Sequence, residues 1–287
     1  MQATIQAYYR LTKPGIIYGN IINATGGFLL ASRGHIDFWL LAATLAGISL
    51  VIAAACVFNN YIDRHIDKHM ARTKKRALVL GTIPGRNALT YALLLQLAGF
   101  AILALATNLL TVVLGVIALF VYVVLYGIGK RRTVYGTIIG SAAGALPPVA
   151  GYVAVSNNFD TGALLLFLIL TLWQMPHFYA IAMYRFDDYA QAKLPVLPVK
   201  KGMFITKINI LLYIAAFTIT TMLLTIFEYT GYTYLVVMAV VGLAWLWRGL
   251  QGFKAADDKV WARKMFLFSL IVILVFSASI SLDAWLP

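Results

Sequence analysis

The chain has 287 residues, of which 62% are hydrophobic and 11% charged, and its mean hydropathy is +0.85. A soluble domain has roughly 45–50% apolar and about 25% charged residues. The composition therefore excludes a soluble protein and predicts an all-α polytopic membrane protein, a single domain over residues 1–287. The net charge of +13 does not indicate nucleic-acid binding, because the basic residues follow the membrane topology.

Nine apolar windows of about 20 residues, the length that crosses a bilayer, account for most of the chain. They lie near residues 15–32, 40–59, 89–107, 109–128, 135–155, 162–183, 208–228, 232–248 and 265–285. With a cytoplasmic N-terminus, every Lys and Arg except Arg33 falls in the N-terminal arm or in or beside an inner loop. This positive-inside pattern predicts nine transmembrane helices, with the C-terminus outside.

The segment NNYIDRHID follows the second window. Asn59, Asp63 and Asp67 recur at four-residue spacing, so on a helix they share one face, where two carboxylates repel by about 0.2–0.5 kcal/mol. Charges at the membrane boundary are costly without a partner, and a broken local rule is typical of a functional site. Mg²⁺ is usually held by one or two carboxylates plus substrate phosphates. We expect Asp63 and Asp67 to bind Mg²⁺, with Asn59 as a neutral oxygen donor. The alternative is a solvated loop.

Basic residues follow this acidic segment and also close the next inner loop. Arg72, Arg76, Lys130 and Arg131 are the candidates for binding a diphosphate, since guanidinium groups suit bidentate phosphate contacts. The alternative is that these charges only determine the membrane topology.

The fifth window reads YGTIIGSAAGALPPVAGY. Gly136, Gly140 and Gly144 form a small-xxx-small face that lets another helix approach closely, and Pro147 and Pro148 interrupt the helix. Helix packing with a kink is one interpretation, and room for a bulky flat ligand is the other.

The sixth window carries WQMPHFYAIA, which places Gln174 and His177 inside the hydrocarbon beside Pro176. Intramembrane polar residues are functional candidates. A hydrogen-bonded pair that supports the proline kink is an equally good interpretation.

The inner loop after this window reads MYRFDDYAQAKLPVLP. Asp188 is a candidate to complete the metal shell, and Arg185 and Lys193 are candidates to bind the anion. Alternatively, Asp187 or Asp188 pairs with Arg185. Because this loop and the one after the second window are the most charged, we expect two similar halves whose loops meet over one site.

The motif NNYIDRHID resembles the N-x-x-x-D-x-x-x-D signature of the UbiA superfamily of intramembrane prenyltransferases. The segments TKPGII, YGTIIGSAAGALPPVAGY, LWQMPHFYAIA and LPVLPV resemble its haem O synthase branch, and the resemblance covers nearly the whole chain. The second motif departs from the superfamily's D-x-x-x-D, since Arg185 and Tyr189 stand where its acids would lie, with Asp188 between them.

The resemblance implies a nine-helix bundle around a central cavity in a bacterial cytoplasmic (inner) membrane, with the active site facing the cytoplasm. It implies Mg²⁺-dependent transfer of the farnesyl group of farnesyl diphosphate to a vinyl group of haem B, with addition of water. The expected pocket for haem and the prenyl chain contains His177 and Gln174. The candidate aromatics facing the carbocation are Tyr61, Tyr126, Tyr135 and Phe178.

Haem A synthase or terminal oxidase assembly are the candidate protein partners, beside the lipid bilayer. A prenyltransferase acting on an aromatic acid or quinone precursor is the first alternative function. A carrier or channel is the second, but it leaves the paired carboxylates without a purpose.

Overall fold

The computed structural model describes residues 2–286, and this range folds into helices and connecting segments without a strand. Some helices cross the molecule alone and others form part of a longer segment that crosses it. They are α2 (Pro14–Ser32), α3 (Phe38–Asp67), α5 (Gly85–Ala106), α6 (Leu109–Phe120), η1 (Val121–Leu125), α7 (Tyr126–Arg132), α8 (Gly136–Gly144), α9 (Leu146–Ser156), α10 (Thr161–Tyr184), α12 (Leu197–Ile226), α13 (Tyr232–Gln251) and α14 (Asp258–Leu282). The short elements are α1 (Gln2–Leu11), α4 (Ala77–Leu80), α11 (Phe186–Gln191), η2 (Gly252–Lys254) and η3 (Asp283–Trp285).

Within the described residues, eight helical segments are long and apolar enough to cross a membrane, and α6, η1 and α7 form one of them. They start at Phe38, Gly85, Leu109, Gly136, Thr161, Leu197, Tyr232 and Asp258. The first predicted window coincides with α2, which is not among the eight. Asn20, Asn23 and Thr25 interrupt the apolar character of α2, so the expected count of nine stays a prediction.

Polar caps begin the helices at one end of the bundle. The side chains of Asp37, Asn108 and Asp160 accept hydrogen bonds from backbone N–H groups in the first turns of α3, α6 and α10. Such caps satisfy N–H groups that have no partner within the helix. These few polar residues of the predicted outer loops therefore have a structural role.

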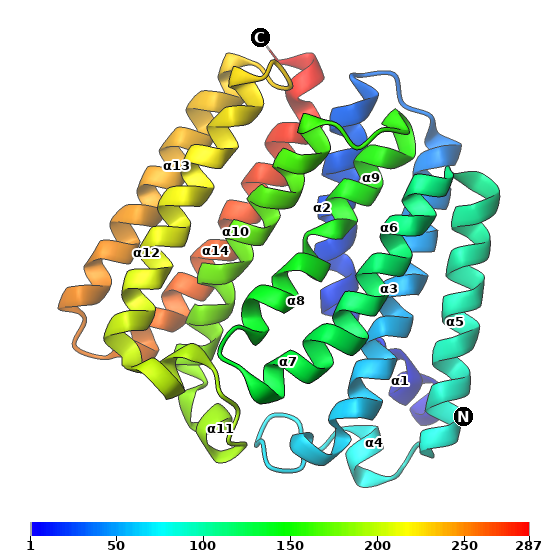
Figure 1. Cartoon of the computed structure of the whole chain (residues 1–287), viewed down its shortest axis with the longest axis vertical. Coiled ribbons are helices and arrows are strands. Elements are labelled where there is room, and N and C mark those ends of the chain that lie inside the picture. The colour runs from blue at the N-terminus through cyan, green and yellow to red at the C-terminus, as the bar shows by residue number, and fades with distance from the viewer. Residues whose placement is uncertain (1, 287) are drawn as a thin grey trace.

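The two chain ends lie at opposite ends of the bundle (Figure 1). The N-terminal α1, together with α4, α11 and the end of α7, lies at the end opposite the C-terminus. The two charged loops predicted to meet do so at this basic end, where the backbone N–H of Ala71 donates to Asp188 Oδ1 at 3.3 Å.

Close helix packing joins α2 to α9. A Cβ added to Gly27 would overlap the carbonyl oxygen of Pro148, and one added to Gly151 would overlap the carbonyl oxygen of Ala24. On the other side of the molecule, α10, α12, α13 and α14 bury Trp245, Phe217 and other large side chains. Helices of both packed groups, among them α2, α10 and α14, line the pocket described below.

The helix breaks at Ala145, and Pro147 and Pro148 lie in the first turn of α9, which confirms the predicted interruption of the fifth window. Since proline has no N–H and its ring clashes with the preceding turn, α8 ends at Gly144 and α9 begins at Leu146. The break lets α8 turn toward α10 while α9 stays against α2.

Candidate active site

A central pocket of about 760 Å³ lies between α2, α3, α8, α10, α14 and the α6–α7 helix. This volume is within the range of small-molecule sites. Its mouth at the basic end is lined by charged side chains, and its interior by apolar, aromatic and amide side chains. The pocket contains eleven of the predicted site residues: Asn59, Asp63, Asp67, Arg72, Arg76, Tyr126, Lys130, Gln174, His177, Phe178 and Arg185.

The two predicted metal ligands lie on the last turns of α3 and face the pocket. Asp63 bonds to Lys130 Nζ and, at 3.0 Å, to Arg131 Nη2. Asp67 Oδ2 accepts from Arg76 Nη1 at 2.6 Å. Cations from other segments thus compensate the repulsion between these like-charged neighbours, with the Asp63 and Asp67 side chains only 13% and 6% exposed.

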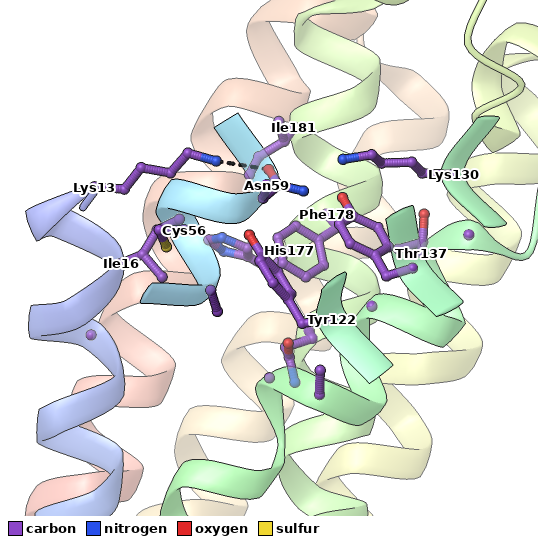
Figure 2. Close-up of a pocket in the computed structure, with 18 of the residues that line it drawn as sticks. Lys13, Ile16, Cys56, Asn59, Tyr122, Lys130, Thr137, His177, Phe178 and Ile181 are labelled. Atoms are coloured by element: carbon purple, nitrogen blue, oxygen red, sulfur yellow. Dashed lines mark hydrogen bonds between the residues drawn. The ribbon is translucent and has the colours of Figure 1, made fainter. Parts of the chain in front are cut away.

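Asn59 continues this row one turn deeper and is 3% exposed. Its Oδ1 accepts a hydrogen bond from Lys13 Nζ at 3.0 Å, whereas its buried Nδ2 has no partner among the described residues. In Figure 2, Lys13 and Lys130 point toward one another across the pocket, with Asn59 between them. An unpaired buried amide beside two ammonium groups is a feature that fits an anionic ligand.

Lys13 is a site residue that the sequence analysis did not assign. It precedes Pro14, in the segment TKPGII at the start of the first window, and this position is the signal that could have identified it. Burial, with help from the positive charges of Arg76 and Lys130, lowers the pKa of Lys13 to about 8. The free site therefore contains a lysine that is charged at neutral pH and loses its proton in mild alkali.

Five predicted site residues lie outside the pocket lining. Arg131 is held beside it by Asp63 and the carbonyl oxygen of Ile62, and Asp188 instead connects the two loops through Ala71. The remaining three are Lys193, Tyr61 and Tyr135.

Lys193 is exposed and has a left-handed backbone conformation with φ 53°. Tyr61 follows Asn59 by two residues, so it projects from another side of α3, where its ring lies 4.1 Å from the Arg64 guanidinium carbon. Tyr135 lies between α7 and α8 and is 64% exposed. The structure therefore does not place either tyrosine where it would face a carbocation in the pocket.

In the second charged loop, Asp187 pairs with Lys259 at 2.7 Å rather than with Arg185. Arg185 and Tyr189 line the pocket, although these residues depart from the expected acidic motif. The loop thus contributes a cation and a phenol to the mouth instead of a second pair of carboxylates.

The rings of Tyr122 and Tyr126, here called the aromatic ladder, lie in and directly after the π-helical segment η1. Tyr122 in η1 and Tyr126 in α7 stack with ring centroids 5.5 Å apart, and Lys130 Nζ lies 4.9 Å from the Tyr126 ring centroid. Tyr122 lines the pocket and was not predicted, because a π-helix leaves no plain signal in the sequence. The ladder carries the aromatic lining from the interior to the charged mouth.

The glycine face of α8 serves close packing. A Cβ added to Gly140 would lie 2.9 Å from Tyr126 ring atoms, and one added to Gly144 would overlap Gln174 Oε1. Gln174 is anchored by hydrogen bonds from Nε2 to the carbonyl oxygens of Ser141 and Leu170, each 3.0 Å. The glycines line the pocket and let these functional candidates come within contact of α8.

The residues fit a magnesium ion that is shared with a substrate. Within residues 2–286, no three His, Cys, Asp or Glu side chains come together as a self-contained metal cluster. Mg²⁺ does not need one, because it keeps several waters and is held by one or two carboxylates plus substrate phosphates. Asp63 and Asp67 supply that carboxylate pair at the mouth of the pocket.

The fold and the pocket define a class of protein. It is a polytopic helical membrane protein whose central pocket is charged at the mouth and apolar inside, as required for a lipid-soluble ligand with an anionic head. The UbiA prenyltransferase family matches residues 20–271, and the chain belongs to this family.

This chain is similar to a protein with more than half of its residues identical and to solved structures with much lower identity. A protoheme IX farnesyltransferase from Sodalis glossinidius (strain morsitans) is 56% identical over 99% of this chain and 96% of its own length. A solved structure of a digeranylgeranylglyceryl phosphate synthase is 20% identical with a TM-score of 0.80, over 99% of each chain. A UbiA homologue from Archaeoglobus fulgidus bound to GPP and Mg²⁺ is 16% identical with a TM-score of 0.68, over 96% of this chain and 99% of that one. These two structures share the fold.

Proposed function

We propose that this protein transfers the farnesyl group of farnesyl diphosphate to a vinyl group of haem B, with addition of water, giving haem O and diphosphate. The similarity to the farnesyltransferase of Sodalis glossinidius over nearly the full chain supports this activity. The observation that carries it is the contact of Asp63 and Asp67 with the cations Lys130, Arg131 and Arg76 at the mouth of an apolar pocket.

The diphosphate head group binds at that mouth. Lys13, Lys130 and Arg185 line it from three different segments, and Arg72 and Arg76 line it from the connection between α3 and α4. They therefore surround an anion rather than touch it from one side. Asp63 and Asp67 hold Mg²⁺, which when bound neutralises charge on the diphosphate. The Archaeoglobus fulgidus homologue bound to GPP and Mg²⁺ supports this pairing of metal and substrate.

Transfer begins when the allylic carbon–oxygen bond breaks and the electron pair leaves with the diphosphate. Fixed cations stabilise the departing charge, and preorganised electrostatic contacts of this kind are worth roughly 2.7–4 kcal/mol each. The Tyr126 and Phe178 rings face the allylic cation, and the apolar walls keep bulk water away from it. The vinyl group attacks the first carbon of the farnesyl chain, and a water molecule then adds to the resulting cation and loses a proton.

The site lies at the cytoplasmic face of the bacterial inner membrane. In this proposal α2 is a ninth span, the N-terminus is cytoplasmic, and the basic end of the bundle is the inner end. The positive-inside distribution and the opposite positions of the two chain ends (Figure 1) support this orientation. Haem A synthase or terminal oxidase assembly receives the product.

The test is product analysis of membranes that contain or lack the chain. Membranes given farnesyl diphosphate, Mg²⁺ and haem B should form a haem whose mass exceeds that of haem B by one farnesyl group and one hydroxyl group. A parallel incubation with 4-hydroxybenzoate tests the alternative acceptor class. Prenylation of 4-hydroxybenzoate without any change in haem mass would overturn the proposal.

A further inference from the structure

His177 is held in one orientation at the wall of the pocket. Its ring stacks on Trp173 with centroids 4.8 Å apart and contacts the rings of Phe178 and Phe266 at 5.3 Å and 5.0 Å. The residue is 9% exposed and lines the pocket, into which Figure 2 shows it reaching. The stacking rings leave the imidazole little freedom to rotate.

A serine on α14 determines where the imidazole proton lies. Ser269 Oγ donates to the carbonyl oxygen of Phe266 at 2.6 Å, which uses its single hydroxyl proton. The 2.8 Å contact between Ser269 Oγ and His177 Nδ1 must therefore be donated by Nδ1. In the neutral imidazole only one nitrogen carries a proton, so Nε2 has a free lone pair.

Ser269 is itself fixed in place. The indole Nε1 of Trp173 donates to the Ser269 carbonyl oxygen at 2.8 Å, so one turn of α10 and one turn of α14 are bonded through the same serine. Among residues 2–286, no hydrogen bond involves His177 Nε2. The result is an oriented nitrogen ligand, with its other nitrogen bonded, at the wall of a large pocket.

We propose that His177 Nε2 is an axial ligand to the iron of the haem acceptor and that Ser269 is the positioning residue that keeps Nε2 unprotonated. This inference rests on the proposed function. Histidine is a common protein ligand of haem iron, and metal-binding histidines almost always donate their second N–H to a fixed acceptor. The bond to iron ties one porphyrin face to α10 and fixes the distance of the porphyrin centre from this wall of the pocket.

The first test compares two porphyrins that differ only in the metal. Purified wild-type protein and the His177→Ala variant are titrated with haem B and with metal-free protoporphyrin IX, without farnesyl diphosphate. We expect His177→Ala to weaken haem binding by on the order of tenfold or more, by analogy with metal-site losses, and to change protoporphyrin affinity by less than about twofold. Equal losses for both porphyrins would overturn the inference and make His177 a packing residue.

The second test observes the bond itself. Resonance Raman spectra of the ferrous haem complex should contain an iron–histidine stretching band in the wild-type protein. The band should disappear in His177→Gly and return, with haem affinity, when imidazole is added. A wild-type complex without the band would overturn the inference.

Ser269→Ala should weaken haem binding on the order of 10–100-fold, as loss of a partner that orients a metal ligand does, and should shift the same band. Ser277→Ala is the matched control, because Ser277 is also buried on α14 but donates to Asn23 at 2.7 Å. It should leave the band unchanged, and a band that is equally unchanged in Ser269→Ala would contradict the positioning role.

Farnesyl transfer by the wild-type protein is measured in parallel to separate the two hypotheses. Formation of haem O without an iron–histidine band would refute the axial ligand and leave the proposed function intact. Absence of any transfer to haem would refute the function.

Discussion

Asp63 and Asp67 show how single residues make the site. Each carboxylate is nearly buried and bonded to a cation outside α3, Asp63 to Lys130 at the distant end of α7 and Asp67 to Arg76 in the segment that follows α3. Removing one partner of such a pair leaves the other charge buried without compensation. The acids therefore keep the cations in place at the mouth, and in the proposed function they also hold the metal.

We expect Asp63→Ala and Asp67→Ala to reduce farnesyl transfer by at least about 10²-fold, the scale on which loss of one key electrostatic contact acts, while the protein still inserts. Transfer is measured in membranes with matched protein amounts. Asp187→Ala is the control, because Asp187 is 69% exposed and pairs with Lys259 outside the pocket; it should keep near wild-type activity. Full activity of both variants at limiting Mg²⁺ would contradict the assigned roles.

Lys13 predicts an alkaline limit to substrate binding. Burial lowers its pKa to about 8, so in the free protein it is charged below that pH and neutral above it. Its attraction for diphosphate is therefore lost as the pH rises through about 8. We expect the KM for farnesyl diphosphate to rise across this interval and the rise to move to higher pH in Lys13→Arg, since arginine stays charged. An unchanged pH profile in Lys13→Arg would remove Lys13 from the anion site.

The row formed by Asn59, Asp63 and Asp67 could be predicted because helical spacing and unusual charge are both visible in the sequence. The position of Lys13 before Pro14 could have marked it as a candidate, but its contact with Asn59 could not be predicted, since the two residues are 46 positions apart. Tyr61 and Tyr135 were assigned by proximity to motifs. Tyr61 projects from another side of α3 and Tyr135 is exposed in the turn before α8, so both lie outside the pocket lining.

At the scale of elements, η1 and α8 position the aromatic ladder: Tyr122 lies in η1, and Gly140 of α8 lies against the Tyr126 ring. A single π-helical turn changes the register of a helix, and such turns are frequent at functional sites. Here it is followed by Tyr126 and Lys130, and Tyr122 lies within it. The apolar window near residues 109–128 predicted a span at this position but could not reveal the local change in hydrogen bonding.

Gly136 is where the start of α8 meets α7. A Cβ added there would lie 2.6 Å from the Lys130 Cα, which is backbone and cannot easily move. We expect Gly136→Ala to destabilise the protein by roughly 1–3 kcal/mol, the usual cost of overpacking, measured by thermal unfolding in detergent. Gly127→Ala is the control, because a Cβ added at Gly127 has no heavy atom within 4 Å. A Gly136→Ala variant as stable as Gly127→Ala would contradict this packing.

For the whole molecule, composition and the positive-inside pattern predicted an all-α membrane bundle, and the structure confirms this class. The relative placement of the spans could not be predicted, since it depends on close contacts such as Gly27 with Pro148 and Gly151 with Ala24. The meeting of the two charged loops was expected from their similar position in each half, and the contact from Ala71 to Asp188 confirms it.

The proposed orientation can be tested by labelling single cysteines. Cys56 is the only cysteine and is buried, so Cys56→Ala provides the background. In intact cells, a membrane-impermeant maleimide should label Asn157→Cys, and it should label Lys200→Cys only after the membrane is opened. The reverse pattern would place the N-terminus and the pocket mouth outside.

The salt bridges at the mouth have a consequence for selectivity. Asp63 and Asp67 are bonded to Lys130 and Arg76, the cations that bind the head group in the proposed function. A phosphate compound without a metal therefore has to compete with these two carboxylates. In the proposed function, a divalent ion bound by the carboxylates would free Lys130 and Arg76 to bind the diphosphate. Each ligand would then increase the affinity of the other by the same factor, and a phosphate compound without a suitable metal would find these cations still paired with Asp63 and Asp67.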